Sequence, residues 1–243
     1  MTKLIINADD FGYCEAVNLG IISAHQNGIV NSCTIMTGMP GFEQALELLK
    51  KNENLGCGVH MTLSCYKPVL NTHKTLVDEN GYFFRRINEE KAKEIDLDEL
   101  YEEFCAQIDK AINSGIKITH LDSHHHVHTL IEFKPVIEKI LKKYDLPIRG
   151  GFEYSLEYDK IVPMIGSFYS SNVEVDYFKK NIKKIKEYEI VDIMSHPAFV
   201  DAFLSKSTSY SIERTLEHEI LTSNELKKFL EDNNITTTNY RNI

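Results

Sequence analysis

The chain has 243 residues, 42% of them hydrophobic, which is enough for a sizeable core in one domain or two small ones. Its formal net charge of -9 argues against a nucleic-acid partner, because phosphate binding needs a basic face. No apolar run is long enough to cross a membrane, the first residues lack a signal-peptide pattern, and the five cysteines form no Cys-x-x-Cys pair. We therefore expect a cytoplasmic protein without membrane attachment.

Short apolar runs alternate with amphipathic stretches in the first quarter of the chain. The expected strands cover residues 3–7, 29–34 and 55–63, and the expected helices cover residues 15–27 and 41–51. Asp9 and Asp10 follow the first strand, where adjacent carboxylates are costly unless a positive group meets them. One aspartate could cap the next helix, but a cap does not need two. His60 closes the third strand and is equally compatible with a buried core residue and a ligand.

The alternation stops at residues 66–96, which we interpret as an inserted loop or hairpin. Asn80-Gly81 is typical of a hairpin turn, and three aromatic residues follow it. Tyr82, Phe83 and Phe84 either cover a pocket or pack beneath the loop, and the pattern does not separate these alternatives.

A histidine-rich run follows an amphipathic helix expected at residues 97–114. Residues 119–129 contain half of the ten histidines, and they also contain Asp122. Histidines two residues apart in an extended backbone can face one metal ion, because alternate side chains point to the same side. A histidine-rich surface tract without ligand geometry is the alternative.

The second half continues the alternation of strands and helices. Helices are expected at residues 133–144, 179–186, 213–221 and 223–231, and strands at 147–150, 190–194 and 235–239, with residues 151–175 irregular. Arg149 ends one strand, where it could pair with the aspartates, and His196 follows another, just before Pro197. Because function in such folds gathers at the carboxyl ends of strands, these residues are site candidates. Nothing divides the chain, so residues 1–243 are expected to form one domain.

Four separated blocks resemble those of the YdjC-like carbohydrate deacetylases, a family that includes chitooligosaccharide deacetylases. The blocks are residues 7–12, 58–60, 120–128 and 195–199, and the likeness also includes Arg214 and Glu217. The resemblance implies a distorted (β/α) barrel similar to that of NodB-type polysaccharide deacetylases. It also implies one divalent metal ion, magnesium or zinc, and removal of acetyl groups from N-acetylated sugars. The metal ligands implied by the resemblance are Asp10, His60 and His124.

The chemistry of amide hydrolysis suggests roles for the remaining candidates. Asp9 would act as general base and Arg149 would orient it, while His196 would protonate the departing amine. His126 and His128 are expected to contact the substrate or support the ligands, and His125 is expected to be structural. Substrate contacts are also expected from Tyr82 and Phe83, although residues 66–96 are not closely shared with the family.

Three other functions fit parts of this pattern. Two histidines and a carboxylate also occur in non-haem iron oxygenases, and a histidine run occurs in non-catalytic metal-binding proteins. A metal-dependent phosphoesterase is disfavoured because few lysines and arginines lie near the blocks. A homodimer stays open, and the expected partner is an N-acetylated mono- or oligosaccharide.

Overall fold

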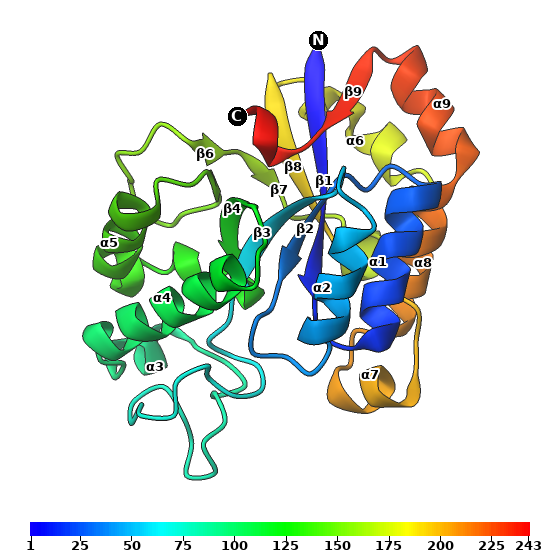
Figure 1. Ribbon diagram of the computed structural model, residues 1–243. Coiled ribbons are helices and arrows are strands. Elements are labelled where there is room, and N and C mark those ends of the chain that lie inside the picture. Colours follow the sequence, from blue (N-terminus) through cyan, green and yellow to red (C-terminus); the bar gives the residue numbers. More distant parts are fainter.

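The computed structural model describes residues 1–243, apart from the side chain of Asn242, and has an α/β fold (Figure 1). The strands are β1 (Thr2–Phe11), β2 (Ser32–Ile35), β3 (Gly56–Met61), β4 (Ile118–Ser123), β5 (Ile148–Arg149), β6 (Ile161–Val162), β7 (Met164–Ile165), β8 (Ile190–Ser195) and β9 (Ile235–Thr238). The α-helices are α1 (Glu15–Asn27), α2 (Phe42–Lys50), α3 (Glu89–Lys93), α4 (Leu97–Asn113), α5 (Lys134–Tyr144), α6 (Tyr177–Ile185), α7 (Ala202–Ser207), α8 (Ile212–Thr222) and α9 (Asn224–Asp232). Short 3-10 helices are η1 (His124–Thr129), η2 (Ile131–Phe133), η3 (Ser170–Asn172) and η4 (Tyr240–Asn242).

The strands form one parallel sheet that curls into a nearly closed barrel. Its order is β6-β5-β4-β3-β2-β1-β8-β7, and β9 pairs with the first half of β1. β6 pairs with β5 while β7 pairs with β8, and only Pro163 separates β6 from β7. These two short strands therefore bring the ends of the sheet together, and the predicted (β/α) barrel is confirmed.

Alternation along the strands places apolar side chains outside the barrel and polar ones inside it. In β1, Leu4, Ile6 and Ala8 join the apolar cluster that packs against the surrounding helices. The interior contains a small apolar layer of Ile5, Val162 and Tyr240. The interior also contains six buried charged or imidazole side chains, which are those of Asp9, His60, His120, Asp122, Arg149 and Asp192. The barrel is therefore filled largely by an ionic network.

Several elements differ from the sequence expectations. The first strand runs on to Phe11 and so includes both aspartates, while residues 151–175 contain β6, β7 and η3. Helices α3 and α7 were not predicted. The expected hairpin is reduced to one antiparallel bridge between Val77 and Phe83, with Gly81 at φ 75 in its turn.

The histidine run is not extended. It forms η1, a kinked 3-10 helix in which His125 and His126 both have φ 55. The expectation that alternate histidines share one face is therefore wrong, because that rule needs a strand backbone.

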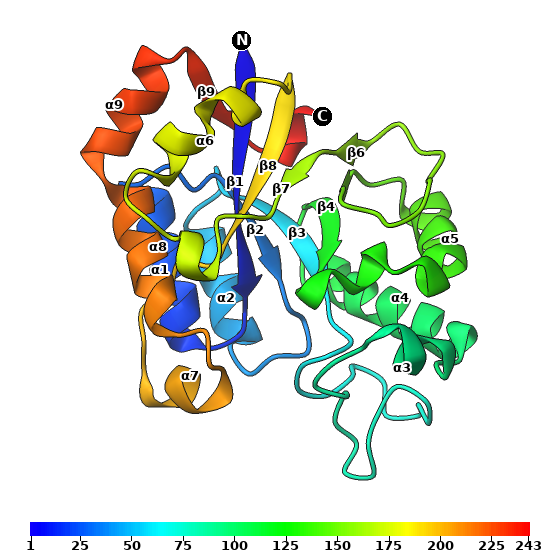
Figure 2. The same cartoon turned by 180° about the vertical axis from the view of Figure 1, so that it is seen from behind.

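Both views show the inserted loop and α7 lying beyond the carboxyl end of β1, whereas η4 lies near the opposite end of the barrel (Figures 1 and 2). Among the described residues, no helix combines the length and the apolar character needed to span a bilayer.

Candidate metal centre and active site

The end of β1 directs both neighbouring aspartates toward the site. In a regular strand Asp9 and Asp10 would point to opposite faces. The register with β2 shifts between Ala8 and Phe11, and Asp10 has φ 67, in the left-handed region that non-glycine residues rarely adopt. Such a backbone persists only where its surroundings enforce it, and it is concentrated at functional sites. The irregular strand end thus lets two adjacent carboxylates serve one site.

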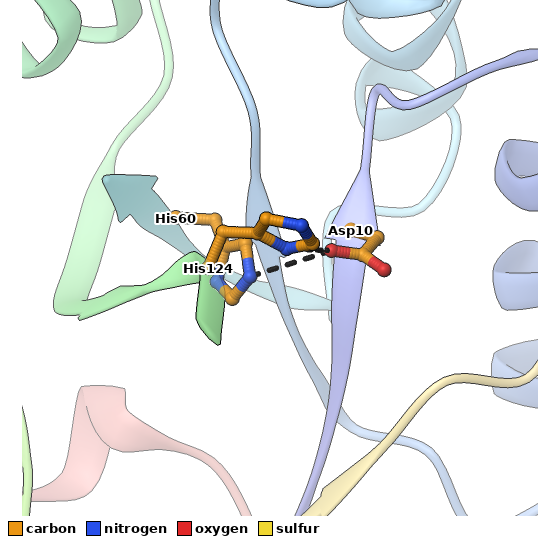
Figure 3. Close-up of side chains that lie close together, drawn as sticks. All are labelled: Asp10, His60 and His124. Atoms are coloured by element: carbon orange, nitrogen blue, oxygen red, sulfur yellow. Dashed lines mark hydrogen bonds and ion pairs between the residues drawn. The ribbon is translucent and has the colours of Figure 1, made fainter. Parts of the chain in front are cut away.

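Asp10, His60 and His124 form a compact group of metal-ligand type (Figure 3). Asp10 Oδ1 lies 3.0 Å from His124 Nδ1 and 3.4 Å from His60 Nε2. Asp10 and His60 are buried, and His124 is partly exposed toward a cavity. One carboxylate and two imidazoles suit a divalent ion and leave coordination positions open, as a hydrolytic site requires. The donor set therefore fits the metal ion implied by the resemblance.

Asp122 orients His60 and was not assigned a role by the sequence. Its Oδ1 lies 2.7 Å from His60 Nδ1, and the two residues are register partners on β3 and β4. A carboxylate on the far nitrogen of a ligand histidine holds the ring in place and raises its basicity. Burial opposes a charge on His60, but Asp122 and the hydrogen bonds with Asp10 and Asp122 raise the pKa of His60 to about 10. The surroundings of the His60 ring thus favour a positive charge at this position.

A second group, Asp9 with His60 and Asp122, is also close enough for metal ligation. Arg149 occupies it, since Nη1 and Nη2 each lie 2.7 Å from one Asp9 oxygen and Nη1 lies 2.7 Å from Asp122 Oδ2. Because a guanidinium already contacts both carboxylates, we assign the candidate metal site to the group that contains Asp10.

Arg149 gives Asp9 its environment. Arg149 Nε also donates to Asp192 Oδ2 at 2.9 Å, and the Tyr240 hydroxyl donates to the same oxygen at 2.5 Å. Burial alone would raise the pKa of Asp9, but the charge of Arg149 outweighs it and lowers that pKa. Asp9 is therefore ionised at neutral pH, and the predicted pairing of Arg149 with this aspartate is present.

His196 lies on the cavity wall and is held by α8. Its backbone N–H donates to Glu217 Oε2, and its Nδ1 lies 3.6 Å from Glu217 Oε1. The Tyr210 hydroxyl donates to the same Glu217 carboxylate, which is fully buried. Glu217 was noted in the sequence only as part of the family likeness, and nothing in the local pattern indicates that it reaches His196.

The other histidines of η1 differ from one another in position. His126 lines the cavity, its Nδ1 has no partner among the described residues, and burial together with the charge of Arg149 lowers its pKa to about 4. His128 is fully buried, with Nδ1 2.5 Å from Ser123 Oγ and Nε2 3.1 Å from the Arg149 carbonyl oxygen. Direct substrate contact by His128 is therefore not supported, and a supporting role fits its position. His125, expected to be structural, is exposed in the cavity beside Ser64.

A cavity of about 1200 Å³ opens over these groups. Residues 66–96 form one wall, where Tyr82 is 40% exposed and Phe83 is 4% exposed. Tyr82 thus presents its ring at the cavity mouth, while Phe83 lines the cavity from the apolar cluster beneath the loop. Both rings therefore line the cavity, and the Phe83 ring also packs beneath the loop.

Two glutamates of α4 hold the inserted loop against the barrel. Glu103 accepts hydrogen bonds from the backbone N–H groups of Val69 and Leu70, and His73 Nε2 lies 3.0 Å from it. Glu99 accepts from the backbone N–H groups of Lys74 and Thr75. The cavity wall is therefore anchored through its backbone.

A carboxylate and two imidazoles converge at the carboxyl ends of the strands, beside a large cavity. The fold and this site place the chain among (β/α)-barrel proteins whose side-chain cluster is suited to binding a metal ion. The family model described as YdjC-like protein matches residues 3–232. The chain belongs to this family.

Relatives named carbohydrate deacetylase align with this chain over nearly its whole length. The protein of Brevibacillus brevis is 36% identical and covers 99% of both chains, and that of Halalkalibacterium halodurans is 40% identical over 90% of this chain and 95% of its own. A solved structure from Enterococcus faecalis, described as that of a candidate cellobiose-phosphate cleavage protein, superposes with a TM-score of 0.92 at 35% identity. It covers 99% of this chain and 98% of its own.

Proposed function

We propose that this chain is a metal-dependent hydrolase that removes acetyl groups from N-acetylated sugars, with residues 1–243 acting as one domain. The observation that supports it most directly is the convergence of Asp10, His60 and His124 beside Asp9, under a cavity large enough for a sugar chain. The relatives named carbohydrate deacetylase point to the same reaction and substrate class.

The proposed ligands are Asp10, His60 and His124, and they would hold one magnesium or zinc ion. When bound, such an ion polarises the acetyl carbonyl and lowers the pKa of a water molecule. His60 is presented through Nε2 because Asp122 engages its Nδ1. His124 presents Nδ1 toward the same carboxylate oxygen.

Asp9 is the proposed general base. Its two oxygens accept hydrogen bonds from Arg149 and one also accepts from Asn7 Nδ2 at 2.8 Å. A carboxylate has about four lone-pair positions, so one remains for the proton of an attacking water. Arg149 keeps Asp9 ionised, as a carboxylate must be to accept a proton at neutral pH, and it fixes the plane of the carboxylate.

His196 is the proposed general acid for the departing amine. An amine leaves poorly unless it is protonated, and His196 reaches the cavity from a different strand end than Asp9. Glu217 holds the His196 backbone and faces its Nδ1, so the ring orientation is constrained. Separate acid and base residues at the ends of the neighbouring strands β1 and β8 suit attack by water followed by departure of the amine.

The wall of the cavity would select the sugar. Tyr66 and Tyr82 stand edge to face with ring centroids 6.0 Å apart, and both are 40% exposed. Exposed aromatic faces suit the apolar faces of pyranose rings. His126, whose Nδ1 lacks a partner among the described residues, would accept or donate a hydrogen bond to a sugar hydroxyl.

Acetate release tests the proposal. The purified protein would be stripped of metal, reloaded with magnesium or zinc, and assayed on N-acetylated mono- and oligosaccharides, with O-acetylated sugars and acetylated lysine peptides as controls. Acetate should appear from N-acetylated sugars only in reloaded samples. Absence of acetate from the whole panel, with metal binding verified, would contradict the proposal.

A metal-dependent phosphoesterase is the second candidate, because the cavity wall carries more positive charge than the motifs suggest. Arg85, Arg86 and Lys206 line the cavity although they lie outside the four blocks. Inorganic phosphate release from phosphorylated sugars, measured in the same samples, separates this reaction from deacetylation.

A further inference from the structure

Arg214 contacts the carboxylate of Asp10 from outside the barrel. Arg214 lies on α8, is 3% exposed, and its Nη2 donates to Asp10 Oδ2 at 2.7 Å. The other oxygen of Asp10, Oδ1, is the one that faces His60 and His124. The two oxygens of one carboxylate thus have separate partners, one cationic and one on the proposed metal side.

The guanidinium is fixed by a second contact. Arg214 Nε donates to the Tyr210 carbonyl oxygen at 2.9 Å, and the Ala198 N–H donates to the carbonyl oxygen of Arg214 at 3.2 Å. Helix α8 also packs against α1. A side chain held at its backbone, its Nε and its Nη2 cannot follow Asp10 if that carboxylate rotates.

Stability alone does not explain this arrangement. Arg214 Nη1 is buried and has no hydrogen-bond partner among the described residues. A buried guanidinium with an unsatisfied donor is costly, and an apolar side chain of similar volume often replaces a buried ion pair without loss of stability. The contact with Asp10 therefore calls for a functional explanation.

We propose that Arg214 is a positioning residue that limits Asp10 to one metal-binding oxygen and reduces the negative charge around the ion. The inference rests on the metal site of the proposed function. With Oδ2 held by Arg214, the carboxylate offers Oδ1 alone, which keeps coordination positions free for water and substrate. Arg149 restricts its aspartate more completely than Arg214 does. It engages both oxygens of Asp9 and removes that carboxylate from the ligand set.

This role predicts an unusual phenotype. In Arg214→Met the freed Oδ2 can become a second ligand oxygen, and a positive charge near the ion is lost. Affinity for a divalent cation should therefore increase, by roughly tenfold or more, although deacetylation becomes slower. A merely structural arginine would leave metal affinity unchanged or weaken it when removed.

Cobalt(II) binding tests the inference without an activity assay. Metal-free wild type and Arg214→Met are titrated with Co²⁺, and the visible absorption per bound ion is recorded, because its intensity falls as the number of ligands rises. We expect tighter binding and weaker absorption in the variant. Arg241→Met is the matched control: Arg241 is exposed and donates to the Glu53 and Leu55 carbonyl oxygens, so its loss should change neither readout.

A double-mutant cycle shows whether Arg214 acts through Asp10. In an Asp10→Asn background there is no carboxylate to restrict and only the charge effect is left, so Arg214→Met should leave the absorption per bound ion unchanged and raise Co²⁺ affinity less than it does in the wild type. If Arg214→Met fails to fold, Arg214→Gln, which removes the charge but keeps a polar side chain, takes its place in the same titrations. Equal spectra and affinities for wild type and Arg214→Met, or additive effects in the cycle, overturn the inference. Failure of the wild type to bind Co²⁺ instead overturns the proposed metal site itself.

Discussion

The interior of the barrel and the inserted loop of residues 66–96 are stabilised by different kinds of polar contact, between side chains in the first and to the backbone in the second. Inside the barrel, Arg149 joins Asp9, Asp122 and Asp192 through side chains that are at most 2% exposed. The loop is joined to α4 through its backbone N–H groups, which leaves side chains such as Tyr82 free at the cavity mouth.

This difference suggests a division of roles. Catalytic side chains that must keep a defined charge and orientation are best placed on strands and paired with one another, because small displacements reduce catalysis strongly. Groups that contact a variable substrate can lie on a loop, where a change of side chain does not disturb the charge network. Variants of the interior should therefore affect the reaction itself, and variants of the loop should affect which sugar is used.

Metal removal should have the largest effect on the interior. Chelation of the ion that Asp10, His60 and His124 are proposed to hold should abolish acetate release, and magnesium or zinc should restore it. Elemental analysis should give one ion per chain. Full turnover by a sample verified to be metal-free would remove the basis for the interior as a catalytic centre.

Asp9→Asn should follow in size. The variant should keep its metal but lose roughly 100-fold to 10,000-fold in kcat, because the general base is gone while the near-isosteric side chain still contacts Arg149. Added metal should not restore the rate. If Asp9→Asn instead loses its metal, Asp9 is a ligand and its role has been exchanged with that of Asp10.

Asp10→Asn should show the complementary pattern. Loss of one charged ligand should lower metal affinity by roughly 10-fold to 100-fold, and excess metal should recover part of the activity. Metal titration and kcat measured on the same protein check this. A crippled rate at full metal occupancy would contradict the assignment of Asp10 as a ligand.

Asp192 gives the interior a pH-dependent stability. Burial raises the pKa of Asp192 from its usual value of 3.8 to about 6, against the charge of Arg149. Because the folded state then keeps a proton that the unfolded state has lost, the contribution of Asp192 to the free energy of unfolding should fall as pH rises from about 4 to about 6.

Comparison with Asp192→Asn isolates this contribution. The wild type should lose up to about 3 kcal/mol relative to the variant across that pH range. Urea unfolding at several pH values measures the difference. A difference that does not vary with pH would show that Asp192 is ionised throughout in the folded protein.

The smallest effects are expected in the loop. Tyr82→Ala should change the ratio of kcat/KM between short and longer sugars by a few-fold without altering metal content, because its ring is exposed at the cavity mouth. Phe83→Ala is the matched comparison and should lower stability by about 3 kcal/mol, since that ring is buried. An unchanged substrate ranking in Tyr82→Ala would show that the loop does not select the sugar.

The sequence alone determined the alternation of strands and helices, because apolar periodicity is a local property, and the family resemblance implied the barrel. Helix α1 was predicted with the same bounds that the structure has, and Asp10, His60 and His124 were proposed together through the family resemblance. The short strands β6 and β7 escaped prediction, since two-residue strands carry no periodic signal.

Only the tertiary structure decided which charges meet. Asp122 lies beside His60 because β3 and β4 pair in that register, and Arg214 and Glu217 reach Asp10 and His196 because α8 packs beside the end of β1. Asp9 and Asp10 look interchangeable in sequence, and a shifted register with a left-handed backbone at Asp10 separates them. These pairings join residues up to 204 positions apart, so no local pattern encodes them.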